Sequence, residues 1–178
     1  DPALTSPYAM YQFFLNAEDA KVIDYLKVFS FRSREEIEEL ERATVEAPFK
    51  REAQRALADD VTDLVHGRSE REAAAAAAAA LFGRGELHEL PLPTLLGAAK
   101  EVGAAEVSGE IGIVEALVAA GVVDSNGAAR RTIADGGAYL NNVKVTDVDQ
   151  VLGDADYLRG RVAVVRRGRK TVGAVVRA

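Results

Sequence analysis

The segment 125–145 places the strictest limit on the fold, because it specifies a helix that leads directly into a tight β-hairpin. Ser125 is a typical N-cap, and Gly136-Gly137 is typical of a helix end. Asn141-Asn142 follows after one short strand, and asparagine tolerates the positive φ that a two-residue hairpin turn requires. Alternation after this turn directs Val143 and Val145 inward and Lys144 outward. This order of elements predicts a small α+β fold.

The same fold class is expected for all of 111–178. A short amphipathic helix precedes Gly121, with its apolar positions at Ile113, Val114, Leu117 and Val118. A final hairpin is predicted over 161–176, with its turn at Arg167-Gly168-Arg169. We therefore expect a compact C-terminal module of two helices and a small sheet.

Residues 1–84 predict a domain that is mainly α-helical. Helix starts are indicated by serine caps and by proline at the first helical position, at Ser6-Pro7, Ser33–Glu36, Ala47-Pro48 and Ser69–Glu72. Residues 16–19 indicate a break between the first two helices, and Gly67 is suited to a C-cap. The alanine run 73–80 has the highest intrinsic helix propensity. The aromatic stripe of Tyr8, Tyr11 and Phe14 is expected in the core.

Residues 85–110 are predicted to be a linker with some structure of its own. Proline and glycine interrupt any long element there, at Pro91, Pro93, Gly97, Gly103 and Gly109. A short helix over 94–101 is expected, with the domain boundary near 105–110.

The charge of the chain is unevenly distributed. The whole chain carries a formal net charge of −6, but residues 1–110 hold −9 and residues 111–178 hold +3. Such asymmetry is the sequence form of a localised electrostatic site. The chain has no cysteine, which excludes disulfides, thiolate metal sites and a cysteine nucleophile, and which is compatible with a cytoplasmic location. Its apolar runs are too short to span a bilayer, so no membrane partner is expected.

Two basic groups in the C-terminal module are the candidate RNA-binding residues. The first consists of Arg130, Arg131 and Lys144, and the second of Arg166, Arg167, Arg169 and Lys170. The turn residues Asn141 and Asn142, beside the first group, are candidates as well. Arginine presents a planar fork to phosphate and can stack on bases. The alternative interpretation is a solvated helix face and an ordinary charged turn. Weaker candidates are Lys50, Arg51 and Arg55; these arginines could instead pair with Glu46, Glu52 or Asp59.

No catalytic or metal-binding constellation is found. The two histidines, His66 and His88, lie far apart in sequence and have no ligand-like spacing to carboxylates. No serine has a plausible His/Asp partner, and no glycine-rich loop has the form that cradles phosphate. We expect neither catalytic, cofactor nor metal residues in this chain.

Three segments together resemble the carboxy-terminal part of a bacterial tyrosyl-tRNA synthetase. Residues 1–14 look like the segment after the family's lysine-serine signature loop. Residues 47–58 with 61–67 look like its helical anticodon-binding domain. Residues 129–145 are similar to its terminal module, of the ribosomal small-subunit protein four type.

The resemblance implies an enzyme that activates tyrosine with ATP and Mg²⁺ and esterifies it to a tyrosine-specific tRNA. The class I signatures do not occur here, so the catalytic domain and most of a homodimer interface are expected outside this chain. The implied role of the chain is to hold the anticodon arm and the long variable arm, with Arg130, Arg131 and Lys144 on the RNA face. Asp19 falls near the position of an anticodon-reading acid, and Asn126-Gly127 departs from the basic residue often found there.

A second interpretation comes from a different class of protein. The acidic first 110 residues would also suit a non-enzymatic scaffold that binds protein, with the basic module as a tether to the ribosome or rRNA.

Overall fold

The computed structural model of the chain describes residues 5–178, so the first four residues of the segment 1–14 lie outside the described residues. The chain divides into two compact units, residues 1–75 and residues 76–178. The first is helical and the second contains a five-stranded sheet, which confirms the predicted fold class. Within residues 5–178 no helix has both the length and the apolar character needed to cross a membrane.

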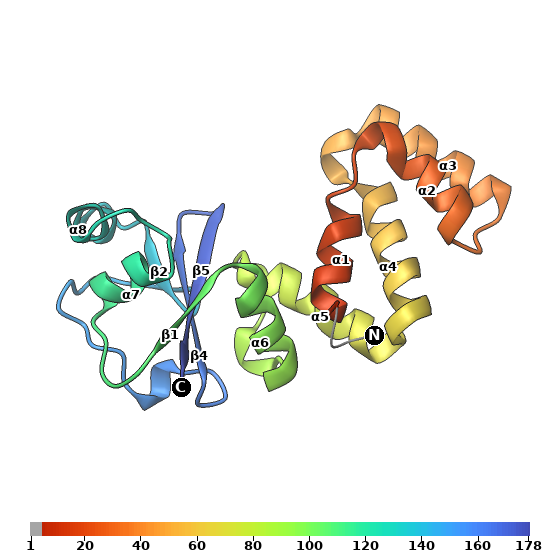
Figure 1. Cartoon of the computed structure of the whole chain (residues 1–178). Coiled ribbons are helices and arrows are strands. Elements are labelled where there is room, and N and C mark those ends of the chain that lie inside the picture. The colour runs from red at the N-terminus through yellow and green to blue at the C-terminus, as the bar shows by residue number, and fades with distance from the viewer. Residues whose placement is uncertain (1–4) are drawn as a thin grey trace. The chain divides into compact units, whose positions relative to one another are not determined.

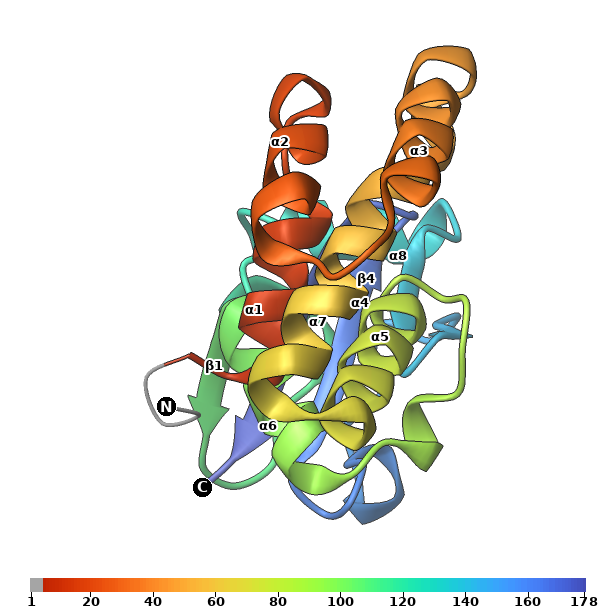
Figure 2. The same ribbon diagram turned by 90° about the vertical axis from the view of Figure 1, so that its right-hand side faces the viewer.

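The first unit is built around a long central helix. Its elements are α1 (Pro7–Leu15), α2 (Asp19–Phe29), α3 (Arg34–Glu46), the short 3-10 helix η1 (Pro48–Lys50), α4 (Glu52–His66) and the first turns of α5 (Arg68–Leu81). Helix α1 lies along α4, and α2 and α3 also pack against α4 (Figure 1; Figure 2). Val22, Leu26 and Leu57 are fully buried at the centre of this unit.

Of the four helix starts predicted in this unit, those at Ser6 and Ser33 are confirmed, Pro48 begins only the 3-10 helix η1 while α4 begins at Glu52, and the fourth is wrong. The Ser6 hydroxyl accepts from the Ala9 N–H, and the capping box of Ser33 and Glu36 is complete. The box predicted at 69–72 is wrong, because α5 begins at Arg68 directly after Gly67. Ser69 therefore lies inside the first turn and cannot act as the cap.

A polar contact joins α1 to α4 inside this unit. Tyr8 and Tyr11 are only 3% and 5% exposed, so the prediction that these tyrosines belong to the core is confirmed. Burial, together with the hydrogen bond between Tyr11 and Asp59, raises the pKa of Tyr11 to about 12. The Asp59 carboxylate also pairs with Arg71 of α5, at 3.9 Å.

The second unit is a mixed sheet covered by helices. After the end of α5 come η2 (Leu87–Glu89), α6 (Leu92–Glu101), β1 (Ala104–Val107), α7 (Ile113–Ala119), α8 (Asn126–Ala134), β2 (Ala138–Leu140), β3 (Val143–Lys144), η3 (Asp154–Asp156), β4 (Val162–Arg167) and β5 (Thr171–Arg177). The strand order is β1-β5-β4-β2-β3, with β1 parallel to β5 and the other pairs antiparallel. Helices α7 and α8 lie on one side of the sheet and α6 on the other (Figure 1).

Strand β4 is buried on both faces, which explains its unbroken run of apolar residues. Ala163 and Val165 pack into the core formed with α7 and α8. Val162 and Val164 are equally buried and alternate with them, so they face the side that α6 covers. The predicted hairpin of β4 and β5 is confirmed, with its turn at residues 168–170.

The segment 85–110 differs from the predicted linker, because it contributes three elements, η2, α6 and β1, to the second unit. Strand β1 is an edge strand that pairs Ala104 with Ala174 of β5, and α6 packs on β4 and β5. Leu87, Leu90 and Leu95 are almost completely buried. Pro91 and Pro93 stand at the start of α6, where proline is tolerated, so these residues mark the start of a helix and do not break one.

The inward direction predicted for Val143 is also wrong. Its side chain is 70% exposed, whereas Val145 is 3% exposed as predicted. Strand β3 comprises only Val143 and Lys144 and lies at the edge of the sheet. Val145 lies beyond the end of the strand, so strand alternation does not place the two valines on the same face.

Candidate nucleic-acid interface

The two predicted basic groups meet at the end of α8. The Gly168 N–H donates to the Gly137 carbonyl at 2.9 Å, which ties the β4–β5 turn to the residues that follow α8. The Lys144 ammonium lies directly over Gly136, so closely that it occupies the space a Cβ would need. The exposed cations Arg167, Arg169 and Lys170 flank Gly168, which is bound to Gly137, and together with Lys144 they form what we call the basic surface.

Sheet register places two of the cations in one row with an aromatic ring. Tyr139 of β2 pairs directly with Lys144 of β3 on one side and with Arg166 of β4 on the other. Directly opposed residues lie on the same face of a sheet. The Arg166 guanidinium carbon stands 4.2 Å from the centroid of the Tyr139 ring, a cation–π contact.

Arg166 differs from its prediction as a surface cation, because it is only 7% exposed. Its Nη1 donates to the Gly168 carbonyl, and its Nη2 approaches Gly83 just beyond the end of α5. Alternation explains the difference: Arg167, one residue later, reaches solvent, whereas Arg166 is directed into the covered face of β4. Arg166 supports the basic surface from beneath.

Asn141 and Asn142 form the turn as predicted, with φ values of 47° and 68°. Their side chains, however, bind protein groups. The Asn141 amide donates to the Asp156 carbonyl at 2.6 Å and accepts from the Val164 N–H at 2.9 Å. The Asn142 amide donates to the Ala80 carbonyl at 2.7 Å. Both residues therefore hold the module together.

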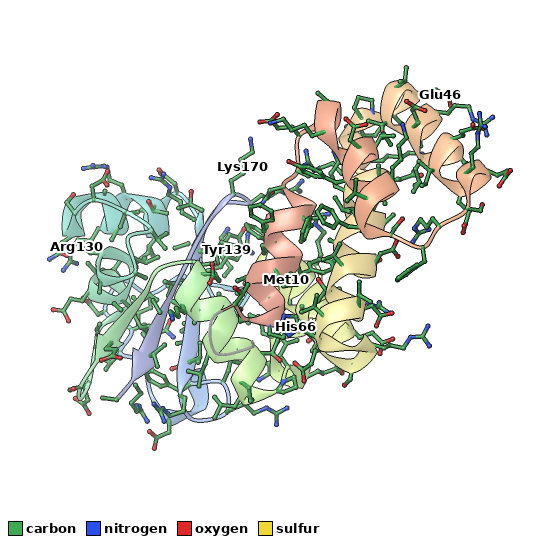
Figure 3. All side chains as sticks on the ribbon, turned by 45° about the vertical axis from the view of Figure 1, so that its right-hand side comes forward. Met10, Glu46, His66, Arg130, Tyr139 and Lys170 are labelled. Atoms are coloured by element: carbon green, nitrogen blue, oxygen red, sulfur yellow. The ribbon has the colours of Figure 1, made fainter. Side chains whose placement is uncertain are left out.

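Arg130 and Arg131 are exposed on α8, and the neighbours found for each of them are groups other than Lys144. Arg130 lines a hollow whose other residues include the acidic Glu115 and Asp149. Arg131 extends back toward Gly127 at the start of the helix. Arg130 and Lys170 project from separate parts of the unit (Figure 3).

In the helical unit, the predicted basic residues are occupied by local contacts. Arg51 donates to the carbonyls of Leu15 and Ala17, at 2.9 and 3.1 Å, and so anchors the α1–α2 loop to the start of α4. Arg55 donates to the Lys50 carbonyl at 2.6 Å. Both arginines thus bind main-chain oxygens and not the carboxylates that the sequence suggested.

Two exposed charges remain beside this loop. Lys50 stands 3.8 Å from Glu52 in a solvated ion pair. Asp19, at the first position of α2, accepts from the buried Gln54 amide at 2.5 Å. That hydrogen bond fixes the direction of an otherwise exposed carboxylate.

Sequence reasoning missed Tyr139 and Gly83, which contact Arg166 from two sides. Strand alternation could have placed Tyr139 and Arg166 on equivalent faces of their strands. Their pairing depends on the register of β2 against β4, which no local pattern specifies.

Comparison with known proteins gives one consistent result. The family described as "Tyrosine--tRNA ligase SYY-like C-terminal domain" matches residues 95–174, and the family described as "tRNA synthetases class I (W and Y)" matches residues 1–83. The tyrosine–tRNA ligase of Cutibacterium acnes is 63% identical over 179 residues, covering 99% of this chain and 43% of that protein. The ligase of Thermobifida fusca is 52% identical, covering 99% and 42%.

Among solved structures, a C-terminally truncated mitochondrial tyrosyl-tRNA synthetase of Aspergillus nidulans is similar to this chain. The match covers 42% of this chain and 22% of the chain in that structure. Its sequence identity is 38% and its TM-score is 0.41. The chain spans less than half the length of the curated relatives that it matches. Two adjacent family matches and two relatives that cover nearly the whole chain show that it belongs to the bacterial tyrosine–tRNA ligase family and corresponds to the C-terminal part.

Proposed function

We propose that this chain holds tyrosine tRNA for a ligase that attaches tyrosine to that tRNA with ATP. The basic surface at Gly136-Gly137 carries the proposal, because it gathers exposed cations on a rigid framework within a chain whose relatives are named tyrosine–tRNA ligases. Phosphate contacts of this kind supply affinity and register on a nucleic acid.

The basic surface suits the backbone of a double-stranded RNA arm better than a single base. Its cations lie on a short turn and an edge strand, and they are exposed. Arg167 and Arg169 can each offer a bidentate fork to phosphate, while Lys144 and Lys170 act as point charges. We therefore assign the long variable arm of the tRNA to this surface.

The helical unit is assigned to the anticodon arm. Asp19 offers an oriented and exposed carboxylate, which can accept hydrogen bonds from the N–H groups of an unpaired base. Lys50 lies in η1, whose following residue Arg51 is bound to the loop that precedes Asp19. The anchored loop supplies the rigidity that base reading requires.

Tyrosine activation with ATP and Mg²⁺ is assigned to a catalytic part whose signatures this sequence does not contain. No residue of this chain is assigned to that step. We further propose that the complete ligase is a homodimer through its catalytic part and acts in the cytoplasm.

The test is a salt series with two RNAs, tyrosine tRNA and a tRNA with a short variable arm. We expect this chain to prefer tyrosine tRNA, and the logarithm of its affinity to fall with the logarithm of salt concentration by roughly 0.7 to 0.9 per phosphate contact. Equal and weak binding to both RNAs would refute the assignment of the variable arm. Equal binding to both, combined with tight binding to ribosomal RNA, would favour the tether.

A further inference from the structure

Arg166 is a buried cation for which the described part of the chain provides no carboxylate partner. Its exposed fraction is 7%, and its Nε has no hydrogen-bond partner among residues 5–178. Its contacts are instead the Tyr139 ring and the Gly168 carbonyl, and its Nη2 lies next to the space that a Cβ on Gly83 would occupy. Burying an unpaired charge is costly, so the position of this guanidinium calls for an explanation beyond fold stability.

We propose that Arg166 is a positioning residue that couples the last turn of α5 to the basic surface. Through this interaction, the position of Gly83 determines whether the β4–β5 turn is held in the geometry that presents Arg167, Arg169 and Lys170 to RNA. The inference rests on the proposed function, since it concerns the same RNA surface.

On the sheet side, Arg166 holds the turn from within. Its Nη1 donates to the Gly168 carbonyl. The Gly168 N–H in turn donates to the Gly137 carbonyl at 2.9 Å. Gly168 is thus fixed through both of its peptide groups, and it adopts φ of 58° between the exposed cations Arg167 and Arg169. Without the hydrogen bond from Arg166, the turn would be free on one side.

On the helix side, the same guanidinium meets the end of α5. A Cβ on Gly83 would lie 3.1 Å from the Arg166 Nη2 and 3.7 Å from the Asn142 Oδ1. Gly83 itself is fixed by its N–H, which donates to the Ala80 carbonyl, and the Asn142 amide donates to that same carbonyl. The C-terminal end of α5 is therefore hydrogen-bonded to the Asn141-Asn142 turn, and the residue Gly83 just beyond it leaves room for Arg166 that a larger residue would reduce.

Little freedom is left for Arg166 to absorb a displacement at Gly83. Its aliphatic stem is enclosed in the sheet, and its planar group is stacked at 4.2 Å on Tyr139. A push on Nη2 must weaken the stacking, the bond to the Gly168 carbonyl, or both. The path from Gly83 to Gly168 thus runs through one rigid side chain.

The experiment compares Gly83→Ala with the matched control Gly103→Ala in this 178-residue chain. Both glycines have a positive φ, +79° and +85°, which is strained for alanine, but a Cβ at position 103 meets no atom within 4 Å. The two variants therefore share backbone strain and differ in their approach to Arg166. Each is measured for binding to tyrosine tRNA across a salt series, with circular dichroism to confirm folding.

We expect Gly83→Ala to bind about ten-fold more weakly than Gly103→Ala, with a salt dependence shallower by roughly 0.7 to 0.9 for each phosphate that the basic surface no longer reaches. A purely structural role for Arg166 would lower the melting temperature without changing the salt dependence of the folded protein. Equal salt dependence in the two variants, while the unsubstituted chain binds, overturns this inference alone. Failure of the unsubstituted chain to bind tyrosine tRNA overturns the proposed function and the inference with it.

Arg166→Lys provides a second route that does not depend on Gly83. Lysine keeps the charge but cannot both stack on Tyr139 and donate to Gly168 in the planar geometry of arginine. We expect this variant to lose the same increment of salt dependence, and Gly83→Ala added to it to cause no further loss. Additive losses in the double variant would show that the two sites act independently, which contradicts the coupling.

Discussion

Gly173→Ala provides the sharpest test of how the second unit is packed. Gly173 lies in β5 opposite Val165, where the chain leaving α7 passes directly over the strand. A Cβ at this position would overlap the Ala120 carbonyl oxygen and would stand 3.0 Å from both the Ala120 Cβ and the Val122 Cγ2. The Ala120 oxygen is a backbone atom, so no side-chain rotation can relieve the overlap.

The expected cost follows from that rigidity. Overpacking a well-packed core costs about 1 to 3 kcal/mol, and a clash with main chain belongs at the upper end of that range. We expect Gly173→Ala to lower the free energy of unfolding of the second unit by about 3 kcal/mol. For a unit of this size the loss corresponds to a decrease in Tm of roughly 10 to 20 °C.

The assay is urea and thermal unfolding of the chain, with Gly127→Ala as the control. Gly127 lies near the start of α8, and the nearest atom to a Cβ there is the Arg131 Nη1 at 3.7 Å. Alanine at this helical position should leave stability unchanged or raise it by up to about 1 kcal/mol. If Gly173→Ala changed stability by less than about 0.5 kcal/mol, the value typical of an indifferent surface change, the packing argument would be refuted.

Three further results are expected. The pKa of Tyr11 is raised from 10.0 to about 12, so the contribution of Tyr11 to the free energy of unfolding is fully present below pH 10. It is lost at roughly 1.4 kcal/mol per pH unit as the pH rises from 10 to 12, and urea unfolding of Tyr11→Phe should lack this decline. Arg32→Met removes two hydrogen bonds to Asp60, of 2.6 and 2.9 Å, and should cost about 1 to 2 kcal/mol in urea unfolding, with no loss contradicting the anchoring role of the pair. Lys144→Met should reduce the salt dependence of tRNA binding by roughly 0.7 to 0.9, whereas Arg130→Met, at a residue that shares a hollow with Glu115 and Asp149, should leave it unchanged.

Local features of the fold could be predicted because local chemistry determines them. The Asn141-Asn142 turn follows from the tolerance of asparagine for positive φ, and the caps at Ser6, Ser33 and Ser125 follow from their hydroxyls. The fold of 85–110 could not be predicted in this way, since β1 is a strand only through its pairing with β5. Proline and glycine indicate where elements begin and end, but they do not show whether those elements join a distant core.

The sequence allowed the charged residues of the candidate site to be predicted, but not their arrangement in space. Arg166 and Arg167 are equivalent in any count of charge, yet one is buried beside Tyr139 and the other is exposed. Which of two adjacent strand residues faces a covering element depends on the packing of α5 and α6, which lies outside any local pattern. The same limit applies to Arg130, whose acidic neighbours come from other segments.

The structure therefore reduces the number of cations available to RNA below the number in the sequence. Four arginines of the positively charged part are engaged within the protein: Arg166 in the sheet, Arg177 with Asp154 and the Tyr157 ring, Arg159 with the Leu90 carbonyl, and Arg161 with the Arg177 carbonyl. The basic surface retains four exposed cations, Lys144, Arg167, Arg169 and Lys170. If each contacts one phosphate, the salt dependence contributed by this surface is roughly 3 to 4 on the logarithmic scale. A much steeper dependence would require phosphate contacts by other cations of the chain. Lys50 of the helical unit, whose ion pair with Glu52 is exposed to solvent, would then be the first residue to mutate.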